Sequence, residues 1–181
     1  GTTWLLKLCN QAWFQQRVPQ DWHLQQAALI YKKGDPSECG NYRPICLLNA
    51  AYKIFAMILL RRLLAAGADD KLWESQFGFR RCRSTEDALH CARRAIERAW
   101  AHRDGRLHML ALDWRKAFDS INTDALLNAL RRFGLPGHVL KVIESIYSDR
   151  KFQVNECGST SEGYRQNSGI CQGCPLSPFL F

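Results

Sequence analysis

The segment Leu107-His-Met-Leu-Ala-Leu112, which runs into Asp113, constrains the fold more than any other stretch of the chain. It is apolar and follows the turn at Gly105, so it predicts a buried β-strand. A carboxylate at the end of such a strand costs free energy unless something pairs with it. Asp113 is therefore a metal ligand, the partner of an arginine or a backbone cap, or a surface charge. Taken alone, the stretch favours a carboxylate that caps the following turn.

The rest of the sequence predicts more helix than strand. Apolar residues at helical spacing, and the capping-box pattern Ser84-Thr-Glu-Asp87, indicate the helices. Asp119 is most simply a turn or helix-cap acceptor ahead of the next helix. We expect helices at residues 4–16, 49–66 and 84–103 and two short ones around Gly134, and strands at 23–33, 107–112 and 151–156, the last in a hairpin with 163–168. This is an α+β fold with antiparallel strands and packed helices.

The composition favours an anionic partner without requiring one. The formal net charge is +8 and the pI about 9.2, values that suit nucleic acid but also occur in proteins that bind none. Apolar runs are too short and too closely followed by arginine for a membrane span. The 8 cysteines are scattered, and the C-x-x-C at Cys171–Cys174 has no second pair to complete a zinc site. We expect reduced thiols and an intracellular location, nuclear or cytoplasmic, rather than secretion.

Several basic residues lie at predicted turns and strand ends among aromatic side chains. They are Lys32, Lys33, Arg43, Arg80 and Arg81. Each could be an ordinary solvated charge, but rigid cations among aromatic rings suit phosphates and stacked bases. Gln172-Gly173 adds a bare backbone and an amide side chain in a glycine-rich turn, which permits close approach of a base or a sugar.

Four segments, taken in order, resemble the successive motifs of a reverse transcriptase of the non-LTR (LINE-like) retrotransposon type. They are YKKGDPSECGNYRPICLLNAAYKIF (31–55), SQFGFRRCRSTEDAL (75–89), LALDWRKAFDSI (110–121) and SGICQGCPLSPFLF (168–181). The resemblance covers nearly the whole chain. It implies a right-hand polymerase fold, with a helical lead-in at residues 1–22, fingers at 23–105 and part of the palm at 106–181.

The resemblance also implies roles for individual residues. Asp113 would be the first catalytic ligand of a two-metal Mg²⁺ site, with the Trp114 backbone carbonyl nearby. Phe118 would be the gate that rejects a 2′-OH and so favours dNTPs. The expected dNTP contacts are Lys32, Lys33, Arg43, Phe118, Gln172 and Gly173, and the expected template contacts are Phe79, Arg80 and Arg81.

One element of the family pattern has no counterpart in this sequence. The family places paired aspartates after a Tyr or Phe some dozens of residues beyond the Gln-Gly motif, and no such sequence occurs here. We therefore expect this piece to be a truncated fragment, lacking the second catalytic motif and the thumb, that has no activity by itself. Cys46, Cys82 and Cys171 stand where the family would have a small or polar residue.

The partners implied are an RNA template, a DNA primer, dNTPs and other parts of one polyprotein, such as the rest of the palm, a thumb and an endonuclease, and no membrane. The alternative function is a relic or repurposed fragment that binds nucleic acid without catalysis. A helical interaction domain with incidental basic charge, and a group II intron maturase, are further alternatives. The order of the four motifs argues against a helical interaction domain. The residues of the KKGD…NYRPI and DWRKAFDS motifs favour the retrotransposon type over a group II intron maturase.

Overall fold

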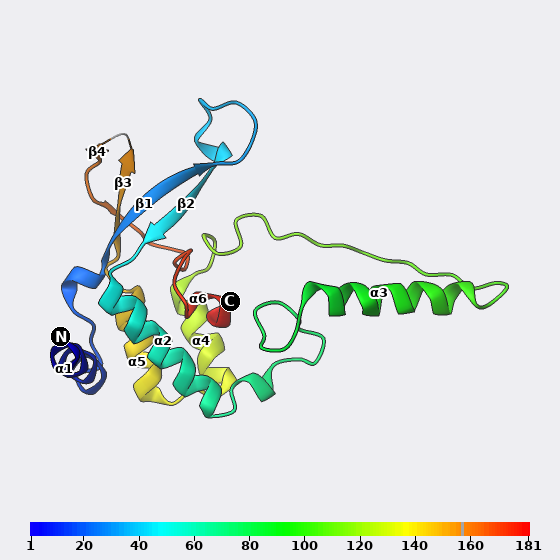
Figure 1. Ribbon diagram of the computed structural model, residues 1–181, viewed down its shortest axis with the longest axis horizontal. Coiled ribbons are helices and arrows are strands. Elements are labelled where there is room, and N and C mark those ends of the chain that lie inside the picture. The colour runs from blue at the N-terminus through cyan, green and yellow to red at the C-terminus, as the bar shows by residue number, and fades with distance from the viewer. Residues whose placement is uncertain (157) are drawn as a thin grey trace. The chain divides into compact units, whose positions relative to one another are not determined.

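The computed structural model describes residues 1–156 and 158–181. The chain forms two compact units, residues 1–61 with 116–181, and residues 62–115. Figure 1 labels the helices and strands of both units. Helices and a mixed sheet confirm a mixed α and β architecture.

The first unit contains a sheet in the order β2-β1-β3-β4, with β5 also paired to β3. The strands are β1 (Leu24–Tyr31), β2 (Tyr42–Leu47), β3 (Lys151–Glu156), β4 (Ser159–Thr160) and β5 (Tyr164–Arg165). β1 and β2 form an antiparallel hairpin in which Tyr31 lies opposite Tyr42. The antiparallel pairing of β3 with β5 confirms the second predicted hairpin.

The prediction of exclusively antiparallel strands is wrong for one pair. β1 and β3 pair in parallel, with Leu24 opposite Lys151. Antiparallel neighbours can be joined by a tight turn, whereas parallel strands need a long crossover connection. Here more than a hundred residues, including four α-helices, separate β1 from β3, so no hairpin signal in the sequence marks this pairing.

Helices gather at one end of this sheet and carry many of the buried apolar side chains of the first unit (Figure 1). They are α1 (Thr2–Phe14), α4 (Thr123–Phe133), α5 (Gly137–Tyr147) and α6 (Ser177–Leu180), with the 3₁₀ turns η1 (Gln20–Trp22) and η2 (Cys39–Asn41). Trp22 contacts the rings of Tyr52 and Phe55, which belong to α2 (Ala50–Ala65). All three rings are buried, so they hold α2 against η1, the turn that leads into β1.

The second unit contains η3 (Asp69–Lys71) and the long helix α3 (Thr85–Trp100). The predicted capping box is confirmed, because the Ser84 side chain accepts from the Asp87 backbone and the Asp87 side chain accepts from the Ser84 backbone. No residue of α3 is buried, although one of its faces is apolar. None of the described helices is long and apolar enough to cross a bilayer.

The predicted strand at residues 107–112 does not form. This segment has no regular secondary structure, and its large side chains are exposed, Leu110 to 83 % and Leu112 to 74 %. A β-strand requires a neighbour to receive its backbone hydrogen bonds, and no strand of the described chain pairs with this one. The apolar pattern was therefore not sufficient for the element.

Candidate functional site

In the first unit, the loop around Gly169 lies directly against the turn that follows Phe118. The Gly169 amide donates to the Ile121 carbonyl at 2.6 Å, and the Ile170 amide donates to the Phe118 carbonyl at 2.8 Å. A Cβ atom on Gly169 would lie 2.9 Å from the Cα of Asp119, so only glycine fits at this contact. Two motifs that are about fifty residues apart in sequence therefore form one local structure.

The same loop continues along the end of β2. The Cys46 amide donates to the Gln172 carbonyl at 3.0 Å. Gly173 adopts a φ of +109°, and a Cβ there would lie 3.1 Å from the Cys46 carbonyl oxygen. The left-handed backbone and the close approach together explain the glycine at this position. Gln172 and Gly173 are thus held as a bare edge beside β2.

The structure assigns Asp119 a role that differs from the predicted one. The N-cap of α4 is Asn122, whose side chain accepts from the Ala125 amide at 2.9 Å. The Asp119 carboxylate instead accepts from Nε2 of Gln172 at 3.1 Å. The prediction of a helix cap at Asp119 is therefore wrong, because Asn122 is closer to the helix start and satisfies that donor. Asp119 orients the side-chain amide of Gln172.

Phe118 is half-buried at the edge of this arrangement. Its ring stacks on that of Phe181, with centroids 5.1 Å apart and planes inclined by 14°. Its backbone carbonyl is already engaged with Ile170. Both the ring and the backbone carbonyl of Phe118 are therefore engaged in contacts within the first unit.

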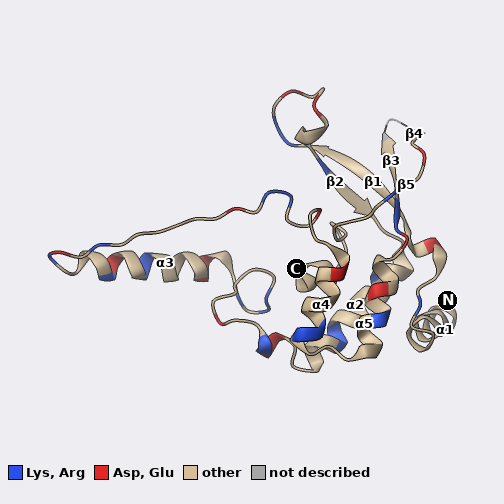
Figure 2. Cartoon of the chain, turned by 180° about the vertical axis from the view of Figure 1, so that it is seen from behind, with Lys and Arg blue, Asp and Glu red and all other residues tan. Residues whose placement is uncertain are grey.

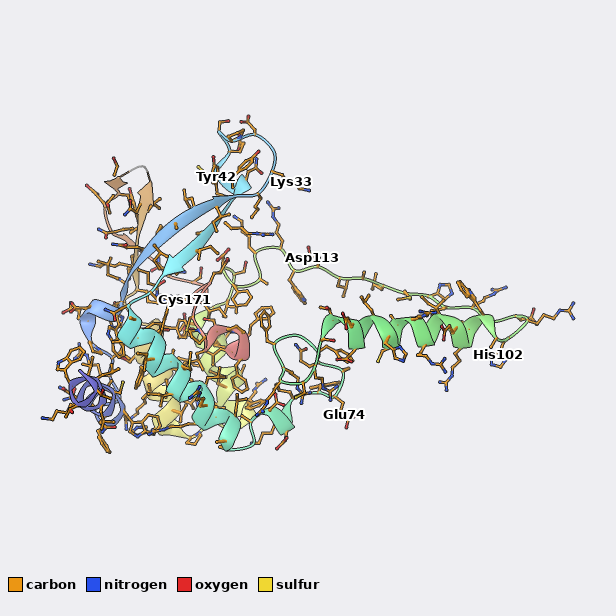
Figure 3. All side chains as sticks on the ribbon, in the orientation of Figure 1. Lys33, Tyr42, Glu74, His102, Asp113 and Cys171 are labelled. Atoms are coloured by element: carbon orange, nitrogen blue, oxygen red, sulfur yellow. The ribbon has the colours of Figure 1, made fainter. Side chains whose placement is uncertain are left out.

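The three predicted phosphate-binding cations of the first unit lie at the loop end of the β1–β2 hairpin. Lys33 follows β1 and Arg43 lies in β2, and both are exposed, as is Lys32. Lys33 and Tyr42 are labelled at this end in Figure 3, and Figure 2 shows the basic residues of the hairpin. None of the ion pairs among the described residues includes Lys32, Lys33 or Arg43. The three cations are available for an anion.

Internal hydrogen bonds shape the hairpin loop that carries these cations. The Lys32 amide donates to the Asn41 carbonyl at 2.8 Å, and the Tyr42 hydroxyl donates to the Pro36 carbonyl at 2.9 Å. Hydrogen bonds from the backbone and the hydroxyl of Ser37 lower the pKa of Asp35, so this carboxylate stays ionised. The loop therefore has a defined conformation.

Arg43 and Cys46 are on the same strand, three residues apart. An extended strand rises about 3.3 Å per residue, so the hairpin cations and the Gln172-Gly173 edge are about 10 Å apart along β2. Sequence alone could not establish this arrangement, since it depends on the hydrogen bond between Cys46 and Gln172. A cavity of about 840 Å³, lined by Arg17, His23, Ser148 and Lys151 among others, contains none of the predicted site residues.

The predicted template residues are in the second unit, and they differ in their surroundings. Arg80 makes a bidentate contact with the Asp69 carboxylate, at 3.3 and 3.1 Å, and also donates to the carbonyls of Asp69 and Trp73. Its side chain is only 10 % exposed. Phe79, by contrast, is exposed and has a φ of +60°, which is rare for a bulky residue. Arg81 is exposed as well.

Asp113 and Trp114 also belong to the second unit, where both are exposed. No hydrogen bond or ion pair joins the Asp113 side chain to any of the described residues, so the turn-cap and arginine-partner interpretations have no support. Within the described residues, no group of three or more His, Cys, Asp and Glu side chains could hold a metal ion. Asp113 is thus a solvent-facing carboxylate (Figure 3).

Sequence reasoning missed a buried polar cluster beneath the Gln172 loop. It consists of Gln25, Cys46, Arg150 and Cys171, from four separate parts of the chain. Their spacing in sequence gives no signal that they meet. The seven described cysteines are free thiols, and Cys157 lies outside the described residues.

The packing of the Gln172 loop on the Phe118 turn brings two of the four motif segments into one local structure. The chain belongs to the reverse transcriptase (RNA-dependent DNA polymerase) family, which matches residues 30–181. This membership confirms the resemblance inferred from the motifs.

The relatives confirm the retrotransposon type. The chain is 31 % identical to a retrovirus-related Pol polyprotein from the type-1 retrotransposable element R2 of Popillia japonica, over 91 % of this chain and 23 % of that protein. It is 31 % identical to a probable RNA-directed DNA polymerase from transposon X-element of Drosophila melanogaster, over 92 % of this chain and 18 % of that protein. It is 29 % identical to a probable RNA-directed DNA polymerase from transposon BS of the same species, over 92 % of this chain and 18 % of that protein. The chain therefore spans about a fifth of the length of these relatives.

Proposed function

We propose that this chain supplies the nucleotide-facing part of an RNA-directed DNA polymerase that transfers nucleotides from dNTPs to a primer. The observation that supports the proposal best is the position of the Gln172-Gly173 edge on β2, the strand that also carries Arg43. A bare backbone edge at one end of a strand and free cations at the other suit the sugar-base and triphosphate parts of one nucleotide.

Each residue has a separate task in this proposal. Lys33, Arg43 and the neighbouring Lys32 neutralise the triphosphate. Phe118, fixed by its ring stacking and its backbone, excludes a 2′-OH. Gln172, oriented by Asp119, borders the incoming nucleotide.

The template contacts fall in the second unit. Phe79 offers an exposed ring for base stacking and Arg81 an exposed cation for phosphate. Arg80, whose donors are engaged within the protein, would shape the loop that presents them. The assignment of residues 1–22 as lead-in, 23–105 as fingers and 106–181 as palm remains part of the proposal.

Asp113 and the Trp114 carbonyl are the proposed Mg²⁺ ligands. One carboxylate does not fit a Mg²⁺ site by itself, because this ion needs fixed octahedral geometry, and the described residues provide no larger group of ligands. No step proposed here depends on the ion. Asp113→Asn should leave dNTP affinity in the absence of divalent ions unchanged.

Equilibrium dialysis with labelled dTTP in chelator tests nucleotide binding directly. Lys33→Ala and Arg43→Ala should each weaken binding at least about tenfold, because a hydrogen bond to a charged group contributes about 1.5–3 kcal/mol. Lys7→Ala, an exposed lysine of α1, is the matched control. Phe118→Val should reduce the preference for dTTP over UTP while leaving dTTP affinity within about twofold. Equal dTTP affinity in all the variants would refute the proposed site.

The second candidate function is nucleic-acid binding without catalysis, which the net charge of +8 favours. It predicts salt-dependent RNA or DNA affinity without dNTP binding. Primer extension by the chain tests whether it catalyses synthesis by itself. We expect no extension, and robust synthesis that Asp113→Asn abolishes would contradict the expectation of an inactive piece.

A further inference from the structure

Arg150 is a buried cation without a carboxylate partner. Its side chain belongs to a residue that is 1 % exposed, and no ion pair among the described residues includes it. Its guanidinium instead lies over the Tyr147 ring at 4.7 Å and donates to the Gly169 carbonyl and, at 3.2 Å, to the Cys171 sulfur. A buried charge is costly unless it is paired. The atom in its surroundings that can carry the opposite charge is the Cys171 sulfur.

Two donors converge on that sulfur. Besides Arg150, Nε2 of Gln25 donates to it at 2.9 Å, and the hydrogen bond from the Cys46 amide to the Gln172 carbonyl holds Cys46 beside the same loop. A neutral thiol is a poor acceptor for two such donors, whereas a thiolate suits them. The neighbouring Cys46 thiol, with further help from Arg150 and Gln25, lowers the pKa of Cys171. The Cys171 sulfur in turn raises the pKa of Cys46, which keeps its proton.

The other titratable groups around Cys171 do not carry the negative charge that would balance Arg150. They are Cys174, Tyr52 and Tyr147. Burial raises the pKa of each of them, so all three stay neutral. Cys174 shares a hydrogen bond with the Tyr52 hydroxyl at 3.1 Å. Cys171 is thus set apart from the second cysteine of its C-x-x-C sequence.

We propose that Cys46 and Cys171 form an oxidisable thiol pair, in which Cys171 is a thiolate balanced by Arg150 and peroxide oxidation closes a Cys46–Cys171 disulfide. The backbone hydrogen bond between Cys46 and Gln172 already holds the two segments side by side. Cys46 is partly exposed, so a water-sized oxidant approaches from its side. This inference goes beyond the proposed function and does not require nucleotide binding.

The reaction has two steps. The Cys171 thiolate attacks hydrogen peroxide; an S–O bond forms, the O–O bond breaks and hydroxide leaves, so this sulfur loses two electrons. The Cys46 sulfur then attacks the sulfenic acid; the S–S bond forms, the S–O bond breaks, and water leaves with the Cys46 proton. The disulfide would tie the loop that carries Gln172 covalently to β2.

Peptide mapping after limited peroxide treatment and alkylation of remaining thiols tests the proposal. Trypsin leaves Cys39 and Cys46 in one peptide, residues 34–53, so the Cys39→Ser protein is used, and fragmentation distinguishes Cys171 from Cys174 in residues 166–181. We expect the Cys46–Cys171 link to form before exposed Cys82 and Cys91 are oxidised. Oxidation of the exposed thiols first, or a Cys171–Cys174 link, would overturn the proposal.

Variants test the two parts of the pair separately. Cys46→Ser should leave Cys171 as a sulfenic acid that dimedone traps, because the resolving thiol is missing. Arg150→Met should slow oxidation of Cys171 about tenfold near pH 5, because below the lowered pKa of about 6 each unit by which the pKa rises removes a factor of ten in thiolate. If Arg150→Met does not fold, the pH profile of the Cys39→Ser protein decides. Rapid linkage well below the usual thiol pKa supports the thiolate, and linkage that begins only near that pKa refutes it.

The link also bears on the nucleotide site, and this part rests on the proposed function. The oxidised protein holds Gln172 and Gly173 covalently beside the strand of Arg43. Dialysis with dTTP should therefore give a different affinity, by at least about threefold, before and after oxidation. An unchanged affinity overturns this coupling alone, because peptide mapping detects the link independently of nucleotide binding.

Discussion

Gly173→Ala should destabilise the fold, weaken dNTP binding, or do both. At a φ of +109°, an alanine is strained, and its Cβ would lie 3.1 Å from the Cys46 carbonyl oxygen. Residues held in such regions cost of order 1–3 kcal/mol, so we expect a loss of about 2 kcal/mol. The strain either lowers the free energy of unfolding or is relieved because the loop moves away from β2.

Moving the loop would break the hydrogen bond from Cys46 to Gln172 and shift the Gln172 side chain off Asp119. Urea unfolding measures the first cost, and dialysis with dTTP on the folded variant measures the second. We expect at least about 1 kcal/mol of destabilisation or a tenfold loss of affinity, which is about 1.4 kcal/mol.

Gly163→Ala is the matched control. Gly163 lies in the same unit, has no atom within 4 Å of a built Cβ and does not have a left-handed φ. Its stability and affinity should stay within about 0.5 kcal/mol of the parent chain. If Gly173→Ala behaves like this control in both assays, the argument from backbone strain at the Gln-Gly edge is refuted.

Three further predictions concern stability, each measured by urea unfolding. Arg80→Ala should lower the free energy of unfolding by about 2–3 kcal/mol, because it leaves Asp69 and two carbonyls without their donor. Substitution of the exposed Arg81 by alanine should change it by less than about 0.5 kcal/mol. Equal effects would contradict the assignment of Arg80 to an internal network. Asn122→Ala should cost about 1 kcal/mol through loss of the α4 cap, and no loss would mean that another group caps the helix. Between the lowered pKa of Cys171, about 6, and the ordinary thiol pKa of about 8.5, the folded pair holds one proton and the unfolded chain two. Stability should therefore rise with pH across this window, by up to about 1.4 kcal/mol per unit, and fall again above it; Cys171→Ser should lose this slope, and an unchanged slope would count against the thiolate.

Local signals in the sequence predicted the local structure well. Ser84 and Asp87 form the predicted capping box, and the second hairpin joins the predicted segments. These features depend on residues that are close in sequence. The family was also predictable, because it rests on the order of four motifs.

Contacts between distant segments were not predictable in the same way. Asp119 was predicted to be a turn or helix-cap acceptor, since its neighbourhood in sequence suits one, but its side-chain partner is Gln172, fifty-three residues later. Arg80 was predicted to contact the template, and its position beside Asp69 is visible only in the folded loop. The parallel pairing of β1 with β3 and the cluster around Cys171 are of the same kind.

The segment at residues 107–112 shows how far an apolar pattern by itself determines structure. Its composition suits a strand, yet Leu110 and Leu112 are exposed and the backbone has no pairing partner among the described strands. Exposed apolar surface costs roughly 25 cal/mol per Å², so this segment gains free energy from any strand that pairs with it and covers it. In the chain alone, its amides should exchange with deuterium at nearly unprotected rates, whereas those of Ala27 and Ile30 in the hydrogen-bonded β1 should be protected. Strong protection at 107–112 would show that the strand forms without such a partner, and that Asp113 is held rigidly rather than facing solvent on an irregular segment.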